Sequence, residues 1–147
     1  MESAKARGIR IYGEVLGSGS TADAHHITAP APGGDGALRC MQLAIEDAGL
    51  SSNDIASINA HGTSTPLNDA AEAEALSKLF GDNGPPVTST KGITGHALGA
   101  AGAIEATAVL LSFIHKQIPP TSGFTTPDPE MAEFNLVTGG PQDWEPG

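Results

Sequence analysis

The chain has 147 residues, of which 39% are hydrophobic and 4% aromatic, a composition that suits one small α/β domain with its own core. Its net charge of −10, with seven Lys and Arg residues, argues against binding DNA, RNA or anionic lipid, because those partners require a basic surface. A single cysteine, Cys40, excludes an internal disulfide, and its apolar surroundings predict a buried structural thiol.

The amino terminus lacks the pattern of a targeting segment. Residues 1–10 carry charges but no apolar run of the kind found in signal peptides, and we expect no later stretch to reach the length of a membrane span without helix breakers. These features predict a soluble, cytoplasmic protein without a membrane contact.

The first predicted elements are a strand and a helix. Residues 9–17 alternate apolar and polar side chains, which predicts a β-strand, and a loop follows to about Pro30. Apolar residues then recur at helical spacing from Leu38, and Gly49 ends this helix.

The middle of the chain predicts a parallel βαβ unit. Short strands over residues 55–59 and 87–89 flank a helix of about residues 69–80. With a last helix over about residues 99–116, the element order is βαβαβα, typical of an α/β fold in which helices cover a sheet.

The last helix is unusual because its first turns consist of glycine and alanine and its later turns are aliphatic on nearly every face. Such a helix is expected to be buried on all sides. After it, residues 119–137 predict an irregular segment with at most a short strand over 134–137. An open parallel sheet with a wholly apolar helix needs more protein to cover it, which predicts a fragment or an obligate partner surface.

Two histidine loops are the main functional candidates. His61 follows the strand over 55–59, and His96 follows the strand over 87–89. Because the carboxyl ends of parallel strands meet at one edge of a sheet, where ligands bind, both imidazoles are expected to converge on one substrate. Two neutral imidazoles aimed at one oxygen would stabilise a developing enolate or oxyanion.

Charges around His96 support a neutral imidazole. Lys91 and the amino terminus of the last helix both disfavour a second positive charge, so His96 is expected to act as a hydrogen-bond donor. Glu105 is the only charge in the apolar helix between His96 and His115 and is expected to pair with Lys91, with exposure to water as the alternative.

Several other interpretations remain open from the residues alone. Thr63 and Thr65 flank His61, and their hydroxyls can cap the helix that begins near Asn68 and Asp69, contact substrate, or do both. A metal site on His61, His96 and Asp69 matches no ligand spacing, so no metal is expected. The glycine-rich turn over residues 92–99 resembles a phosphate-binding turn, but neither its spacing nor its order fits a nucleotide motif. His25 and His115 are expected to be structural.

The two histidine motifs carry a family resemblance. NAHGTSTPLNDAAEAEAL (residues 59–76) and STKGITGHALGAAGAIEA (residues 89–106) resemble the histidine motifs of β-ketoacyl-acyl-carrier-protein synthases, most closely synthase II of type II fatty-acid synthesis. ADAHHITAP and QIPPT match flanking segments in the same order. The resemblance covers most of the chain and implies a single partial domain over residues 1–147, the carboxyl-terminal half of a thiolase-like fold.

The resemblance also implies an activity. In this family a cysteine takes the acyl chain from the carrier protein, and two histidines, matched by His61 and His96, promote decarboxylation of a malonyl thioester. Lys91 and Glu105 match the pair behind the second histidine. Thr28, Thr63, Thr65 and His26 match positions near the phosphopantetheine arm of the acyl carrier protein. No cofactor is implied.

Two departures bear on activity. The family's nucleophilic cysteine lies in the amino-terminal half, so Cys40 is not its counterpart, and the family continues beyond residue 147 into a glycine- and phenylalanine-rich turn and closing strands. The resemblance therefore implies a chain that is inactive alone and needs the amino-terminal half, within a parent enzyme that is a homodimer.

Two alternatives remain. Polyketide ketosynthases share both motifs but usually read HGTGT and KSNIGH, so the variants here favour fatty-acid synthesis. A non-catalytic subunit like a chain-length factor is the second alternative, and retention of both histidines argues against it.

Overall fold

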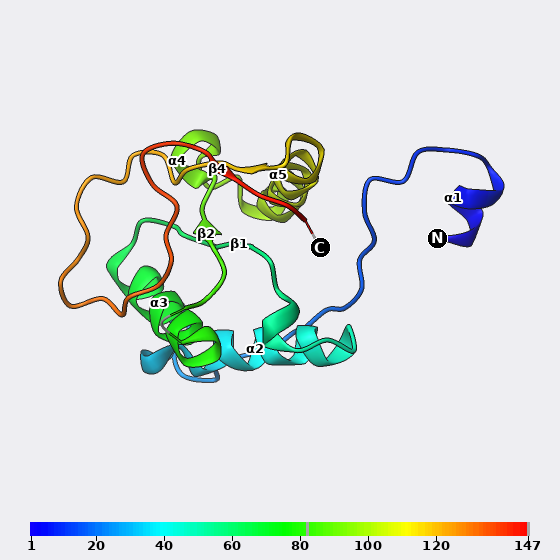
Figure 1. Cartoon of the computed structure of the whole chain (residues 1–147). Helices are drawn as coiled ribbons and strands as arrows, with labels where there is room; N and C mark the ends of the chain where they lie inside the picture. Colours follow the sequence, from blue (N-terminus) through cyan, green and yellow to red (C-terminus); the bar gives the residue numbers. More distant parts are fainter. Residues whose placement is uncertain (82, 147) are drawn as a thin grey trace.

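The computed structural model describes residues 1–81 and 83–146, so position 82 and the last residue of the predicted domain lie outside the described residues. Two short strands lie between two layers of helices (Figure 1). The strands are β1 (Ile58–Asn59) and β2 (Val87–Thr88); α2 (Asp35–Asp47) and α3 (Pro66–Phe80) form one layer, and α4 (Lys91–Thr94) and α5 (Ala101–His115) the other.

The predicted parallel βαβ unit is confirmed. β1 and β2 pair in parallel with Ile58 opposite Val87 and Asn59 opposite Thr88, and α3 makes the crossover. The first strand is shorter than predicted: a 3₁₀ turn, η2 (Ser52–Asp54), ends before the predicted strand begins, and pairing starts only at Ile58. α3 begins at Pro66, earlier than predicted, since proline suits the first turn of a helix.

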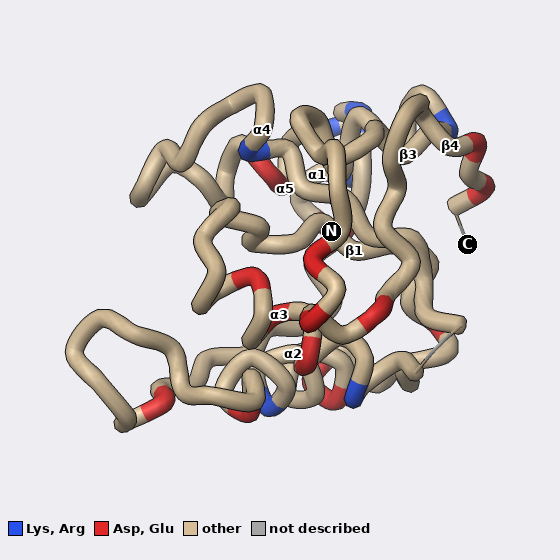
Figure 2. The backbone as a smooth tube through the Cα atoms, turned by 90° about the vertical axis from the view of Figure 1, so that its left-hand side faces the viewer, with Lys and Arg blue, Asp and Glu red and all other residues tan. Residues whose placement is uncertain are grey.

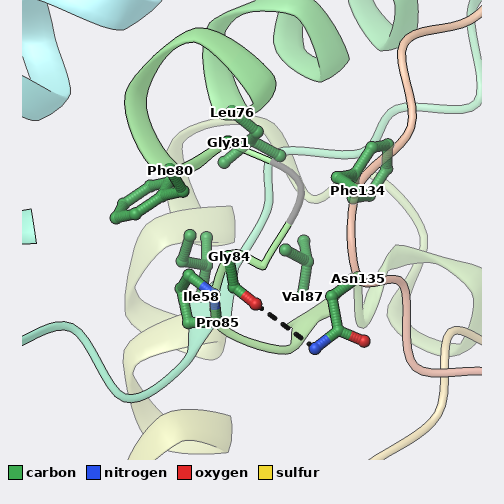
Figure 3. A pocket seen from close by; sticks show the side chains of 9 residues that line it. All are labelled: Ile58, Leu76, Phe80, Gly81, Gly84, Pro85, Val87, Phe134 and Asn135. Carbon is green, nitrogen blue, oxygen red and sulfur yellow. Dashed lines mark hydrogen bonds between the residues drawn. The ribbon is translucent and has the colours of Figure 1, made fainter. Parts of the chain in front are cut away.

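A small apolar core joins the sheet to α3. Ala60, Leu76 and Val87 are buried together, and the partly buried side chains packed against them are Met41, Ile58, Phe80 and Phe134. A depression of about 180 Å³ lies beside this core, where Asn135 Nδ2 donates to the carbonyl of Gly84 at 3.4 Å (Figure 3). Its water-accessible volume is only about 10 Å³, far below the roughly 300–1,000 Å³ of typical ligand pockets.

A lysine joins the helices α2 and α3. Lys78 of α3 donates to the carbonyl of Gly33 at 2.6 Å and to the carboxylate of Asp35 at 3.0 Å. Gly33 belongs to the 3₁₀ turn η1 (Pro32–Gly34), which leads into α2. Acidic residues predominate along α2 and α3 (Figure 2), so this layer has the acidic character predicted from the overall charge.

The end of the chain runs beside α5. β3 (Gln117–Ile118) pairs antiparallel with β4 (Gln142–Asp143), and neither strand was predicted from the sequence. Trp144 stacks on Phe113 of α5 with ring centroids 5.1 Å apart. Leu136 makes a single parallel bridge to Val87, which agrees with the prediction of at most a short strand over 134–137.

The predicted strand over residues 9–17 is wrong. No strand is assigned to this segment, which crosses to the rest of the protein after a short helix, α1 (Glu2–Ala6), that lies apart (Figure 1). Instead of pairing, its end lies against α2, where a Cβ at Gly17 would overlap the carbonyl of Ala44. An alternating pattern favours extended backbone, but pairing depends on a neighbouring strand that local sequence does not specify.

Two predictions about burial are also wrong. Cys40 is only partly buried, although its thiol donates to the carbonyl of Gly19 at 3.1 Å. In α5 only Ala101 and Ser112 are buried, and the large apolar side chains exposed on this helix are Ile104, Leu111, Phe113 and Ile114. The helix is packed on one side by described residues and is open on the rest.

The expectation about membrane spans needs a correction. By length and composition alone, the stretch Leu98–His115 is long and apolar enough to cross a membrane. This is weak evidence, because core helices of water-soluble proteins meet the same criterion, and the buried partner of Glu105 described below shows that part of α5 packs against protein.

Candidate active site

The two predicted histidines lie side by side at one edge of the sheet. His61 follows β1 directly, and His96 follows the short helix α4 that comes after β2. Their ring centroids are 5.2 Å apart, with the ring planes at 88°, and both residues are exposed. The structure therefore brings the two imidazoles together as the parallel crossover predicts, while their catalytic role stays a prediction.

The hydrogen bonds of His96 identify its tautomer. The backbone N–H of Leu98 donates to His96 Nδ1 at 3.2 Å, so Nδ1 is the unprotonated nitrogen. The proton of the neutral ring then lies on Nε2, which is left as a hydrogen-bond donor. This is the tautomer that His96 needs for the donor role that the sequence predicts, and that role stays a prediction.

Lys91 and Glu105 form a buried ion pair behind the second histidine loop. Lys91 opens α4, Glu105 lies in the second turn of α5, and their side chains are 5% and 19% exposed. The ammonium donates to the Glu105 carboxylate. The interpretation of Glu105 as solvent-exposed is therefore excluded, and α4 is fixed to α5 close to His96.

A carboxylate that the sequence analysis missed holds the first histidine loop. Glu72 of α3 accepts a hydrogen bond from the backbone N–H of His61 at 2.7 Å and another from that of Gly62 at 2.8 Å. Helix-capping rules do not identify Glu72, because they concern the first three residues of a helix and Glu72 lies in its second turn. The sequence does offer a signal: a carboxylate in the second turn of a helix can reach back to the backbone amides of the loop that precedes that helix.

Ser89 connects the two loops and was also missed. Its hydroxyl donates to the carbonyl of Gly62 at 3.2 Å, and the N–H of Lys91 approaches Ser89 Oγ at 3.5 Å. Gly62 has a φ of +43°, and a Cβ there would lie 2.5 Å from Ser89 Oγ. Glycine is therefore required where the two loops touch.

The remaining predicted site residues are more dispersed. Thr63 and Thr65 share a hydrogen bond of 2.8 Å between their hydroxyls, and Thr65 takes the N-cap position of α3 without a side-chain cap. His26 Nδ1 accepts from the N–H groups of Thr28 and of the residue after it, at 3.2 and 3.1 Å. Within the described residues, no hydrogen bond joins His26 or Thr28 to either candidate histidine.

The rival sites gain no support from the structure. Across residues 1–81 and 83–146, no group of three or more His, Cys, Asp or Glu side chains is placed to hold a metal ion. The glycine-rich segment after β2 folds into α4 and a 3₁₀ turn, η3 (Leu98–Ala100), so it does not lead straight from strand to helix as phosphate-binding turns do. His115 lies exposed in the last turn of α5.

The site is open. The second depression, about 230 Å³, lies between the sheet and α5 and, like the first, includes neither histidine. A substrate held by the two imidazoles would need a further surface above the histidine edge to exclude water.

Comparisons with known proteins agree with this geometry. Residues 12–125 match the family model of the β-ketoacyl synthase C-terminal domain. A 3-oxoacyl-[acyl-carrier-protein] synthase 2 from Staphylococcus aureus is 49% identical over 145 residues, which are 97% of this chain and 36% of that protein. The chain thus spans about a third of the length of the curated relatives it matches.

Solved structures match with similar coverage. The ishigamide ketosynthase/chain length factor has a TM-score of 0.91 and 41% identity, covering 98% of this chain and 35% of that one. Another match is the structure of a type II polyketide synthase acyl-carrier protein in complex with its ketosynthase. It has a TM-score of 0.91 and 36% identity, and the match covers 97% of this chain and 35% of that one.

Proposed function

Because this chain belongs to the β-ketoacyl synthase C-terminal domain family, which has a thiolase-like fold, we propose that it supplies the malonyl-decarboxylating part of a 3-oxoacyl-[acyl-carrier-protein] synthase. That enzyme performs a decarboxylative Claisen condensation, which lengthens an acyl thioester by two carbons in fatty-acid synthesis. The observation that carries the proposal is the meeting of the His61 and His96 rings, with centroids 5.2 Å apart.

The mechanism follows from where charge develops. When malonyl thioester loses CO₂, the electrons of the broken C–C bond form an enolate, and negative charge collects on the thioester oxygen. The Nε2–H of His96 and an N–H of His61 donate to that oxygen and stabilise the charge. Removing one such donor typically costs about 10²–10³ in rate.

The ion pair supports the second donor. Lys91 places a buried positive charge close to the His96 loop, and Glu105 compensates that charge so that it can remain buried. Lys91 also fixes α4, and hence the direction from which His96 approaches the substrate. Thr63 and Thr65, together with Thr28 and His26, contact the phosphopantetheine arm that carries the malonyl group.

The remaining parts of the reaction come from elsewhere. The amino-terminal half of the parent enzyme contributes the nucleophilic cysteine, covers the open histidine edge and completes a homodimer, so the 147-residue chain alone is inactive. The acyl carrier protein delivers both substrates. The protein works in the cytoplasm, without a metal or cofactor, and without nucleic acid or membrane partners. The open site and the match to a ketosynthase in complex with its acyl-carrier protein support this arrangement.

A polyketide ketosynthase is the second candidate, because one matched structure, at 36% identity, contains the ketosynthase of a type II polyketide synthase. The motif variants HGTST and TKGITGH, and the 49% identity to a fatty-acid enzyme, favour the first. A chain-length-factor-like subunit without activity is disfavoured, because such a subunit has no need of two converging imidazoles.

The test is CO₂ release from malonyl-carrier protein by this chain mixed with the amino-terminal half of the enzyme. We expect the wild-type pair to decarboxylate malonyl-carrier protein. His61→Ala and His96→Ala should each reduce the rate of decarboxylation by about 10²- to 10³-fold. His115→Ala, an exposed histidine of α5 outside the site, is the matched control and should retain the rate. Activity that survives the loss of either loop histidine would contradict the two-donor mechanism.

A further inference from the structure

Glu72 holds the His61 loop through backbone atoms alone. Its two carboxylate oxygens accept separately from two consecutive amides, His61 N–H to Oε1 and Gly62 N–H to Oε2. The side chain of Asn68 approaches Oε2 as a third donor at 3.4 Å. Hydrogen bonds to a charged acceptor are stronger than neutral ones, so this is the strongest described attachment of the loop to α3.

The loop needs such an attachment because its backbone is unusual. Gly62 and Ser64 both have positive φ, at +43° and +60°. A non-glycine residue in this region costs free energy and persists only where surrounding contacts fix it. The amides of His61 and Gly62 are held by Glu72, and the carbonyl of Gly62 is held by Ser89, so the backbone is fixed from two sides.

The place of Glu72 makes the attachment rigid. It lies in the second turn of a 15-residue helix whose neighbouring positions Ala71 and Ala73 are buried, so its Cα has little freedom. By contrast, the imidazole of His61 is exposed and has no hydrogen-bond partner of its own among the described contacts. Its position therefore depends on the backbone that Glu72 holds.

We propose that Glu72 is the positioning residue for His61, and that its bidentate grip on the His61 and Gly62 amides sets the His61 ring against His96. The role in catalysis rests on the proposed function; the grip on the loop and the ring contact do not. The carboxylate does not touch substrate and acts through the backbone. Its effect on the reaction is to align the first donor with the oxygen that the second donor also contacts.

The variant Glu72→Gln separates this role from that of a surface charge. A carboxamide can accept through its oxygen only, and its NH₂ would face the second backbone N–H donor, so at least one hydrogen bond is lost. The matched control is Glu74→Gln, two positions along the same helix, where the carboxylate is exposed and, among the described residues, pairs only with Lys78 at 3.9 Å. Both variants remove the same charge.

The first measurement uses the 147-residue chain in solution and does not depend on activity. In Glu72→Gln we expect hydrogen-exchange protection of the His61 and Gly62 amides to fall by about 10- to 100-fold, as for loss of a charged hydrogen bond. The proton NMR contact between the two imidazole rings should also disappear. Glu74→Gln should retain both. Unchanged protection and ring contact in Glu72→Gln, or equal loss in the control, overturns the proposal.

A wild-type measurement covers the case in which the variant does not fold. The nitrogens of the His61 and Gly62 amides should each show scalar coupling across the hydrogen bond to the Glu72 carboxyl carbon, because each N–H donates to one of its oxygens. Absence of both couplings overturns the proposal.

The second measurement addresses catalysis in the chain combined with the amino-terminal half. Glu72→Gln should lower kcat for malonyl decarboxylation about 10- to 100-fold with little change in KM, because a misplaced donor weakens transition-state stabilisation more than binding. A rise in KM at constant kcat would overturn the positioning role. If the wild-type pair is inactive, the proposed function fails, and the NMR measurements still decide whether Glu72 positions His61.

Discussion

Lys91 carries a charge where water scarcely reaches, with its side chain 5% exposed. Glu105→Gln would leave this ammonium buried without its counter-charge, which typically costs about 3–5 kcal/mol of stability. Since Glu105 itself is 19% exposed, we expect a loss near the lower limit, about 3 kcal/mol, measured by urea unfolding. Glu46→Gln, an exposed change of the same charge on α2, should alter stability little.

A double variant tests whether the pair itself is responsible. Lys91→Met combined with Glu105→Leu removes both charges, and buried pairs replaced by apolar residues are often neutral. The double variant should therefore be more stable than Glu105→Gln alone. A double variant less stable than the single one would show that Lys91 has another essential partner.

Gly62 is the residue at which the two histidine loops touch. In Gly62→Ala the new methyl group meets Ser89 Oγ at 2.5 Å in addition to the cost of positive φ, so we expect a loss of about 2–4 kcal/mol in the free energy of unfolding. The control is Gly49→Ala, which has a φ of +69° but no atom within 4 Å of the added carbon. It should lose only about 1 kcal/mol. Equal losses would mean that the loops separate easily.

Single residues also show what the sequence can and cannot specify. His61 and His96 were found because each follows a strand, and parallel strands end at one edge. Glu72 was not found, because its role depends on how α3 packs, with its second turn beside the His61 loop. Ser89 was not found because its contact with Gly62 joins residues 27 positions apart.

At the scale of elements, local pattern predicted the three long helices but missed the short helices α1 and α4 and failed for the strands outside the β1–β2 pair. α2, α3 and α5 were predicted within a few residues, because helical hydrogen bonds are local. The predicted strand over 9–17 was wrong and the β3–β4 pair was missed, because a strand exists only if a distant segment pairs with it. The partner is a property of the whole fold rather than of the segment.

The turn η2 offers a test of an element with a pH readout. The Ser51 hydroxyl and backbone N–H donate to Asp54, and these hydrogen bonds hold the pKa of Asp54 below its ordinary value of 3.8. A lowered folded-state pKa stabilises the turn above the unfolded value, and this stabilisation is lost as pH falls through the folded-state pKa. Ser51→Ala should move the pKa of Asp54 upward toward 3.8, measured by carboxyl NMR titration. An unchanged titration would contradict the capping interaction.

At the scale of the whole molecule, the exposed apolar side chains are the main departure from a self-sufficient domain. Val15 is 90% exposed, and α5 leaves Leu111 and Ile114 exposed at 48% and 43%. Leu111 and Ile114 are three positions apart on one helix and so are neighbours on its surface, and exposed apolar surface of this kind favours association. We expect the isolated chain to self-associate with rising concentration in analytical ultracentrifugation and to bind hydrophobic dyes.

Charged substitutions on α5 test this expectation. Leu111→Lys with Ile114→Lys should reduce self-association, because both residues lie on the exposed side of α5. The control, Gln42→Lys with Asn53→Lys, adds the same charge at exposed polar positions and should associate like the wild type. A wild-type chain that stays monomeric at all concentrations would contradict the account of this surface.

In the proposed mechanism, His61 and His96 donate to one thioester oxygen. The decisive measurement is a structure of this chain joined to the amino-terminal half, with a bound malonyl thioester analogue that cannot decarboxylate. We predict that one nitrogen of each ring lies within about 2.7–3.2 Å of the same carbonyl oxygen, with Nε2 as the His96 donor. An analogue bound with that oxygen on only one imidazole, or away from both, would contradict the claim.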